Sequence, residues 1–104
     1  MFTHSKLDSG LSLITAPIEG SKTTTVLAMI ATGSKYETRE QSGLSHFLEH
    51  MFFKGTTKRP NAHAISSELD KIGAEFNAFT SKEYTGYYVK VASDNMDTAI
   101  DVVS

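Results

Sequence analysis

The sequence predicts an α+β fold, an antiparallel-rich sheet covered by helices, and three observations support this class. Strand-like segments occur in pairs that are joined by short turns, as in β-hairpins. Between the pairs lie segments with helical apolar spacing and with helix start and stop signals. The chain has 104 residues, which is enough for one small domain. We therefore expect two strands, a third strand, two helices, two strands and a final helix.

The first part of the chain is predicted to form a hairpin and a longer strand. Phe2–Lys6 and Leu11–Ala16 flank Asp8-Ser9-Gly10, a turn sequence that is typical of hairpins. Thr23–Thr32 is rich in Thr, Val and Ile and almost unbroken in apolarity. Such a run predicts a central strand that is buried on both faces. Gly33 ends this strand, and residues 34–42 form a polar loop.

Two helices are expected next. The first spans Gly43–Lys54, and Gly55 closes it just past its end. The second begins after Asn61, whose side chain suits the N-cap position. Gly73 stops this second helix. Its apolar stripe recurs at helical spacing and consists of Ile65, Leu69 and Ile72.

The last part of the chain predicts a second hairpin and a third helix. Glu75–Thr80 and Tyr84–Ala92 read as strands joined at residues 81–83. Asp94 is expected to cap the third helix. The apolar stripe of that helix consists of Met96, Ile100 and Val103. The helical pattern reaches Ser104 without a stop signal, so we expect a sandwich that is cut short.

The composition excludes several classes of function. The net charge is −2 and no basic patch is present, so the sequence predicts no nucleic-acid partner. There is no cysteine, which excludes disulfides and thiolate metal sites. No signal peptide and no apolar run of membrane-spanning length is found. We therefore expect no membrane partner and a cytoplasmic location in a bacterium.

The segment that carries chemistry lies in the first predicted helix. His46 and His50 are four residues apart, so their imidazoles share one helix face and can bind one metal ion. Glu49 lies beside them, in the pattern His-x-x-Glu-His. Zn²⁺ binds neutral imidazole nitrogens and keeps one coordination position open in catalytic sites. It activates a water molecule and polarises a scissile carbonyl, and a nearby carboxylate such as Glu49 can act as general base.

An ordinary helix with two surface histidines is the alternative that this motif leaves open. Of the other histidines, His63 lies on the second predicted helix between Ala62 and Ala64 and is interpreted as a surface residue, and His4 lies on the first strand. Two imidazoles and a carboxylate discriminate weakly between divalent ions, so another metal also remains open.

Three blocks of the sequence resemble one family of zinc metallopeptidases. The helix block runs from Gly43 to Thr56 and reads GLSHFLEHMFFKGT. It is preceded by Gly33-Ser34-Lys35-Tyr36-Glu37 and followed by a block at residues 77–85 that reads NAFTSKEYT. Together they are similar to the pitrilysin, insulysin and mitochondrial processing peptidase family, the inverzincins. The similarity is strongest to bacterial processing-peptidase-like members.

The resemblance implies a zinc endopeptidase that hydrolyses peptides or protein presequences. It implies that His46 and His50 bind zinc, and that Glu49 is the catalytic base. It also implies that an edge strand containing Asn77, Ala78 and Phe79 pairs with an extended peptide substrate. The third zinc ligand of the family, a Glu, would lie beyond Ser104, since Glu68, Glu75 and Glu83 come too early.

By the same resemblance, residues 1–104 form the N-terminal part of one metallopeptidase domain, a processing-peptidase-like α/β sandwich. The resemblance leaves a homodimer or a heterodimer of the full-length parent open.

Two other functions remain open at the level of the sequence. The first is a metal-dependent lyase of small molecules, since the S-ribosylhomocysteine lyase family also has a His-x-x-x-His metal pair around a Glu. That family uses a cysteine as a further ligand, and this chain has none. The second is a catalytically incomplete fragment or subunit that only holds substrate. Such subunits usually lack an intact metal motif, whereas this chain has one.

Overall fold

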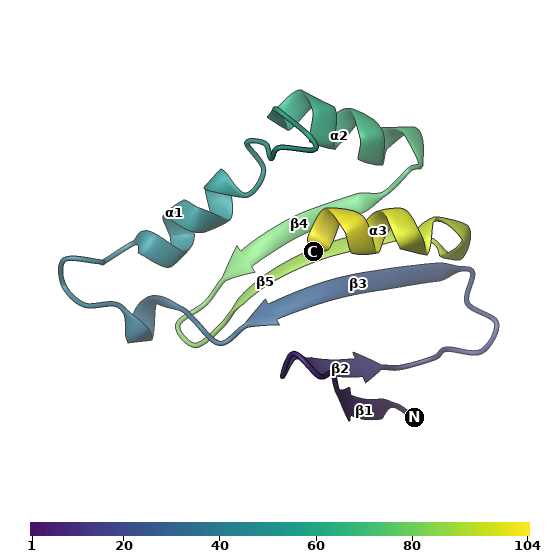
Figure 1. Cartoon of the computed structure of the whole chain (residues 1–104), viewed down its shortest axis with the longest axis horizontal. Helices are drawn as coiled ribbons and strands as arrows, with labels where there is room; N and C mark the ends of the chain where they lie inside the picture. The colour runs from purple at the N-terminus through teal and green to yellow at the C-terminus, as the bar shows by residue number, and fades with distance from the viewer.

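The structure, a computed structural model, describes all 104 residues and confirms the α+β class (Figure 1). Its main sheet has three antiparallel strands in the order β3-β5-β4: β3 (Thr23–Ile30), β5 (Thr85–Ala92) and β4 (Glu75–Thr80). A separate two-stranded sheet consists of β1 (Thr3–Lys6) and β2 (Ser12–Thr15). The predicted hairpin at the start of the chain is thus confirmed, with Lys6 opposite Ser12 and Thr3 opposite Thr15.

The third strand differs from its prediction, because β3 lies at an edge of the sheet and β5 occupies the centre. The β4–β5 hairpin forms locally, and β3 pairs with the free side of β5, with Val26 opposite Val89. Only alternate residues of β3 pack against the helices. Leu27 and Met29 point to the other face, where their exposures are 47% and 56%. The continuous apolarity of this segment therefore reflects an uncovered face and not burial on both sides.

Two helices build the core on one face of the main sheet. α2 (Ala62–Lys71) starts where predicted, since Asn61 Oδ1 accepts the Ala64 N–H at 2.8 Å. α3 (Met96–Val103) packs against β3 and β5 (Figure 1). The side chains of the core come from α2, β5 and α3. They are Ile65, Leu69, Val89, Val91 and Ala99.

The predicted start of the third helix is wrong, and so are two of the three residues of its predicted stripe, whereas Val103 packs against the core as expected. Asp94 lies inside a short 3₁₀ helix, η2 (Ser93–Asn95), and no side chain caps α3. Met96 and Ile100 are exposed, whereas Ala99 is fully buried. Ala99 therefore faces the sheet, and Val102 and Val103 are partly buried and pack against the core beside it.

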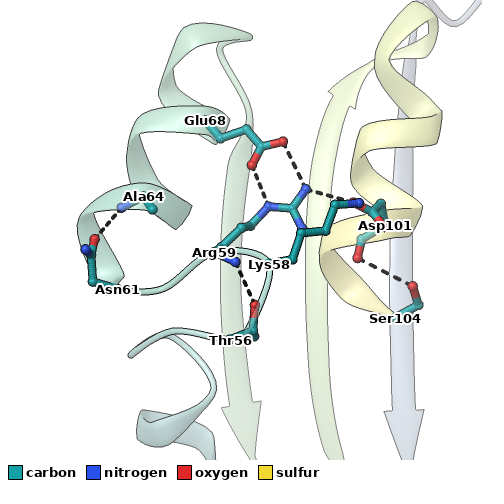
Figure 2. Close-up of polar contacts among 8 residues, drawn as sticks. All are labelled: Thr56, Lys58, Arg59, Asn61, Ala64, Glu68, Asp101 and Ser104. Carbon is teal, nitrogen blue, oxygen red and sulfur yellow. Dashed lines mark hydrogen bonds and ion pairs between the residues drawn. The ribbon is translucent and has the colours of Figure 1, made fainter.

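A buried arginine joins α2 and α3 (Figure 2). The side chain of Arg59 is 10% exposed, and its guanidinium donates two hydrogen bonds to Glu68 of α2, at 2.5 and 2.9 Å. It donates a third to Asp101 of α3, at 2.8 Å. These carboxylates raise the pKa of Arg59 further above its already high value, which keeps it charged. The segment that precedes α2 is thereby linked to both α2 and α3.

None of the helices has the length and apolarity that a membrane span requires.

Candidate metal centre

The His-x-x-Glu-His motif lies on α1 (Leu44–Met51), which contacts β4. This helix is shorter than predicted, because the chain leaves it at Met51 and turns through Phe52–Lys54. The Lys54 N–H bonds to the Met51 carbonyl at 3.1 Å, which closes this turn. Gly55 follows with a φ of 141°, and its backbone lies against Pro60. The close approach directs residues 56–60 toward α2.

His46 and His50 lie one turn apart on the exposed side of α1. Their Nε2 atoms are 3.0 Å apart, and the two rings meet edge to face with 4.6 Å between centroids. In a tetrahedral zinc site with Zn–N bonds of about 2.0–2.1 Å, two ligand nitrogens are separated by roughly 3.3 Å. The two nitrogens therefore fit neighbouring positions of one coordination shell with little movement.

Glu49 points from the same helix toward the sheet. Its side chain is half-buried, and its carboxylate accepts a hydrogen bond from the Thr80 hydroxyl at the end of β4. Tyr87 of β5 is a further neighbour, and its ring packs on Phe52 with centroids 4.6 Å apart. Burial, and secondarily the negative charge of Glu49, raises the pKa of Tyr87. Thr80 thus restricts the orientation of the carboxylate next to the histidine pair.

A polar cavity of about 270 Å³ opens beside His46 at the start of α1. Glu37 lies in its wall, and its two carboxylate oxygens accept N–H groups of Gly43 (2.9 Å) and Ser45 (2.6 Å). These bonds, that of Ser45 first, hold the pKa of Glu37 below its usual range. No hydrophobic residue lines this cavity.

The donor set fits two positions of a metal site. No third His, Cys, Asp or Glu joins the pair into a group of three potential ligands. The carboxylate oxygens of Glu37 accept N–H groups at the start of the helix, and one oxygen of Glu49 accepts the Thr80 hydroxyl. Within residues 1–104, the two imidazoles are thus the potential ligands that lie together.

The residues implied in substrate binding lie on β4, an edge strand of the main sheet. Asn77 Oδ1 accepts the N–H of its neighbour Ala78 at 2.8 Å. The Phe79 ring covers Gly86 of β5, where a Cβ atom would collide with it, and meets the Tyr84 ring edge to face. The edge position agrees with the sequence-based expectation, whereas the role of these three residues stays a prediction.

Sequence reasoning missed Glu37, Thr80 and Tyr87 as neighbours of the site. Glu37 and Thr80 were included in blocks that carry the family resemblance, but no role was assigned to them. Their partners are 8 and 31 residues away in the chain, so only the folded structure brings each pair together. For Thr80 the sequence holds one signal of a position near the site, because this residue ends the predicted strand that contains Asn77, Ala78 and Phe79.

Comparison with known proteins identifies the family. The sequence profile of the insulinase family, peptidase family M16, matches residues 13–104. The chain belongs to this family. It shares 43% identity over 98 residues with the mitochondrial-processing peptidase subunit beta of Dictyostelium discoideum, covering 94% of this chain and 21% of that protein.

Bacterial proteins are among the other relatives. The uncharacterized zinc protease YmxG of Bacillus subtilis (strain 168) is 55% identical over 75 residues, which cover 72% of this chain and 18% of that protein. A crystal structure of a protease from Helicobacter pylori superimposes with a TM-score of 0.92 at 26% identity, over 99% of this chain and 24% of the other. This M16 chain thus spans no more than about a quarter of the length of these relatives, and both the resemblance and the fold inferred from its sequence are confirmed.

Proposed function

We propose that this M16 chain contributes the zinc-binding histidines and the general base of a metalloendopeptidase that hydrolyses peptide bonds by attack of water. The observation that carries the proposal is the convergence of His46 and His50, with Nε2 atoms 3.0 Å apart, beside the oriented carboxylate of Glu49. Relatives named zinc proteases and a processing peptidase support the same reaction class.

Each of the three side chains has one task in this proposal. His46 and His50 hold the metal ion as neutral imidazoles. When bound, Zn²⁺ supplies Lewis acidity that polarises the scissile carbonyl and acidifies water. Glu49 accepts the proton of the attacking water and delivers it to the leaving amine. Thr80 holds the Glu49 carboxylate toward the end of β4, which limits the orientations that the base can adopt.

We also propose that β4 receives the substrate as an added strand. The edge position of β4 supports this mode, in which main-chain hydrogen bonds provide affinity and side-chain pockets provide specificity. Asn77, Ala78 and Phe79 would line the added strand. The Asn77 side chain occupies the Ala78 N–H and has to release it if a peptide carbonyl is to bind there. Substrates would therefore be extended peptides or protein presequences.

Zinc titration of the 104-residue chain tests the metal site. We expect wild type to bind zinc and His46→Ala or His50→Ala to weaken binding at least about ten-fold, because one of two imidazole ligands is lost. His63→Ala is the matched control, since His63 is an exposed helical histidine whose Nε2 contacts only Ser67. Equal zinc affinity in His46→Ala and His63→Ala would contradict the proposed ligands.

The base is tested in a longer, peptidase-active protein that contains this chain. Glu49→Gln is expected to keep zinc and to lose peptide hydrolysis by two orders of magnitude or more, roughly the contribution of general-base catalysis. Normal hydrolysis by zinc-loaded Glu49→Gln protein would exclude Glu49 as the base.

The two other functions give different results in the same assays. A lyase would cleave ribosylhomocysteine and not peptides, and the absence of cysteine leaves it without that family's further ligand. A subunit that only holds substrate would bind peptides without turning them over. The word subunit in the name of the Dictyostelium relative supports a dimeric parent. We propose a location in the cytoplasm of a bacterium, since several relatives are bacterial proteins named zinc proteases.

A further inference from the structure

The start of the metal-binding helix lacks an ordinary cap. The N-cap residue is Gly43, which has a φ of 87° and no side chain with which to accept a hydrogen bond. Its first turn contains no acidic residue. The first N–H groups of any helix need acceptors from elsewhere, and a negative charge near them is stabilising. Glu37, six residues before Gly43, provides both through its bonds to the N–H groups of Gly43 and Ser45.

Glu37 is itself attached to the sheet. It follows a short 3₁₀ helix, η1 (Ser34–Tyr36), that docks on the β4–β5 turn. The N–H groups of Ser34 and Lys35 donate to the carbonyls of Ser81 (3.2 Å) and Lys82 (2.9 Å). Gly33 is buried in this contact, and a Cβ atom there would lie 2.6 Å from the Lys82 carbonyl oxygen and closer still to that of Ser81.

The helix is consequently fixed at two points that belong to one end of β4. Thr80 binds Glu49 directly. The turn that follows Thr80 binds Ser34 and Lys35, which lie just before Glu37, and Glu37 binds Ser45. His46 lies between these two attachment points along the helix. A helix of only eight residues, with most side chains exposed, has little stability of its own. Its position relative to the sheet therefore depends on such attachments.

We propose that Glu37 is a positioning residue that holds His46 in register with His50 and Glu49, and not a metal ligand. The inference rests on the proposed zinc site, since it assigns Glu37 a task for that site. Both carboxylate oxygens accept backbone N–H groups, and Glu37 forms no group of three potential metal ligands with the histidines. The consequence is that zinc affinity depends on a residue that does not touch the metal.

Glu37→Gln tests the proposal, because it keeps the size of the side chain and removes its charge and one of its two acceptors. Two quantities are measured: amide hydrogen exchange of Gly43 and Ser45 in metal-free protein, and zinc affinity. We expect exchange at both amides to accelerate, and zinc affinity to fall, by about ten-fold, as for the loss of a helix cap. Glu40→Gln, the same change at an exposed residue of the same loop, is expected to alter neither.

Exchange at Leu69 and Val91, both buried in the core, provides an internal reference for global unfolding. If exchange accelerates equally at Ser45 and at these core amides, Glu37 stabilises the whole fold and not the start of α1 in particular, and the proposal is overturned. Faster exchange at Ser45 with unchanged zinc affinity would overturn it as well. If Glu37→Gln fails to fold, Glu37→Asp is used, which keeps the charge and shortens the reach, and the same criteria apply.

The two proposals can fail separately. If wild type binds no zinc, the proposed metal site is wrong, while the exchange comparison in metal-free protein still decides whether Glu37 holds the start of α1. Slow exchange of Gly43 and Ser45 in Glu37→Gln would refute the positioning role even if wild type binds zinc tightly.

Discussion

At the scale of single residues, the site depends on side chains that hold other side chains. Glu49 is the proposed base, and the Thr80 hydroxyl donates to its carboxylate and restricts its orientation. A hydroxyl that donates to a half-buried carboxylate contributes more than an exposed contact, since the acceptor has lost part of its hydration. The orientation of the Glu49 carboxylate therefore depends on a contact between two residues that are 31 positions apart in the sequence.

Thr80→Val removes this hydroxyl and keeps the shape of the side chain. We expect the free energy of unfolding to fall by about 1–2 kcal/mol, because the carboxylate of Glu49 loses its donor inside the fold. Urea denaturation at neutral pH measures this change. Thr57→Val, at an exposed threonine, is the matched control and should shift it by less than about 0.5 kcal/mol. Equal effects of both substitutions would show that the Thr80 bond adds no stability.

The charge of Glu37 gives a prediction on pH. Because the bonds from Ser45 and Gly43 lower the pKa of Glu37 in the folded protein, its ionised form stabilises the fold. That contribution is complete above the pKa of an unfolded Glu, about 4.3, and is lost as the pH falls through the lower value of the folded state. NMR titration of the Glu37 carboxyl carbon measures this directly. A midpoint at or above the unfolded value would contradict the observed hydrogen bonds.

At the scale of elements, Arg59 connects helices that come from different parts of the chain. Its guanidinium bonds Glu68 nine residues away and Asp101 forty-two residues away (Figure 2). The loop that leaves α1 is fixed as well, since the Arg59 N–H bonds Thr56 Oγ1 at 3.0 Å. Arg59 therefore links α2 and α3 to the loop that leaves α1.

Arg59→Met is expected to destabilise the fold by about 2 kcal/mol. Removal of one partner from a fully buried ion pair costs about 3–5 kcal/mol, and the value is lower here because Glu68 and Asp101 are 41% and 43% exposed. Lys58→Met is the matched control, since Lys58 also binds Asp101 but is 68% exposed, and it should cost less than about 1 kcal/mol. Chemical denaturation compares the two, and a larger loss in Lys58→Met would contradict the argument.

The comparison of elements also explains what the sequence could predict. Local signals located both hairpins and the second helix correctly, because Asn61, Gly73 and the short turns act within a few residues. The convergence of His46 and His50 follows from helical spacing alone. Strand order does not, since the pairing of β3 with β5 joins residues about sixty positions apart. For the same reason, the sequence does not predict the hydrogen bonds of Glu37 with Ser45, of Thr80 with Glu49 or of Arg59 with Asp101.

At the scale of the whole molecule, the chain exposes more surface than a compact domain of its size. Its accessible area is 7945 Å², whereas folded monomers of this mass expose roughly 5,800 Å². The radius of gyration is 15.1 Å, compared with about 13 Å for a compact domain of this length. Part of the excess is the uncovered face of the main sheet, where Leu27 and Met29 lie on β3. An apolar face of this kind promotes association in water.

We therefore predict that the isolated 104-residue chain binds an apolar dye such as ANS and self-associates at micromolar concentration. The double substitution Leu27→Ser and Met29→Ser should reduce both signals, because it removes two exposed apolar side chains from one strand face. Thr23→Ser and Thr25→Ser on the same face are the control, since they change little apolar area. Dye fluorescence and sedimentation velocity measure the outcome. If the wild-type chain stays monomeric and does not increase the fluorescence of the dye, the apolar sheet face is not accessible in solution and the prediction is wrong.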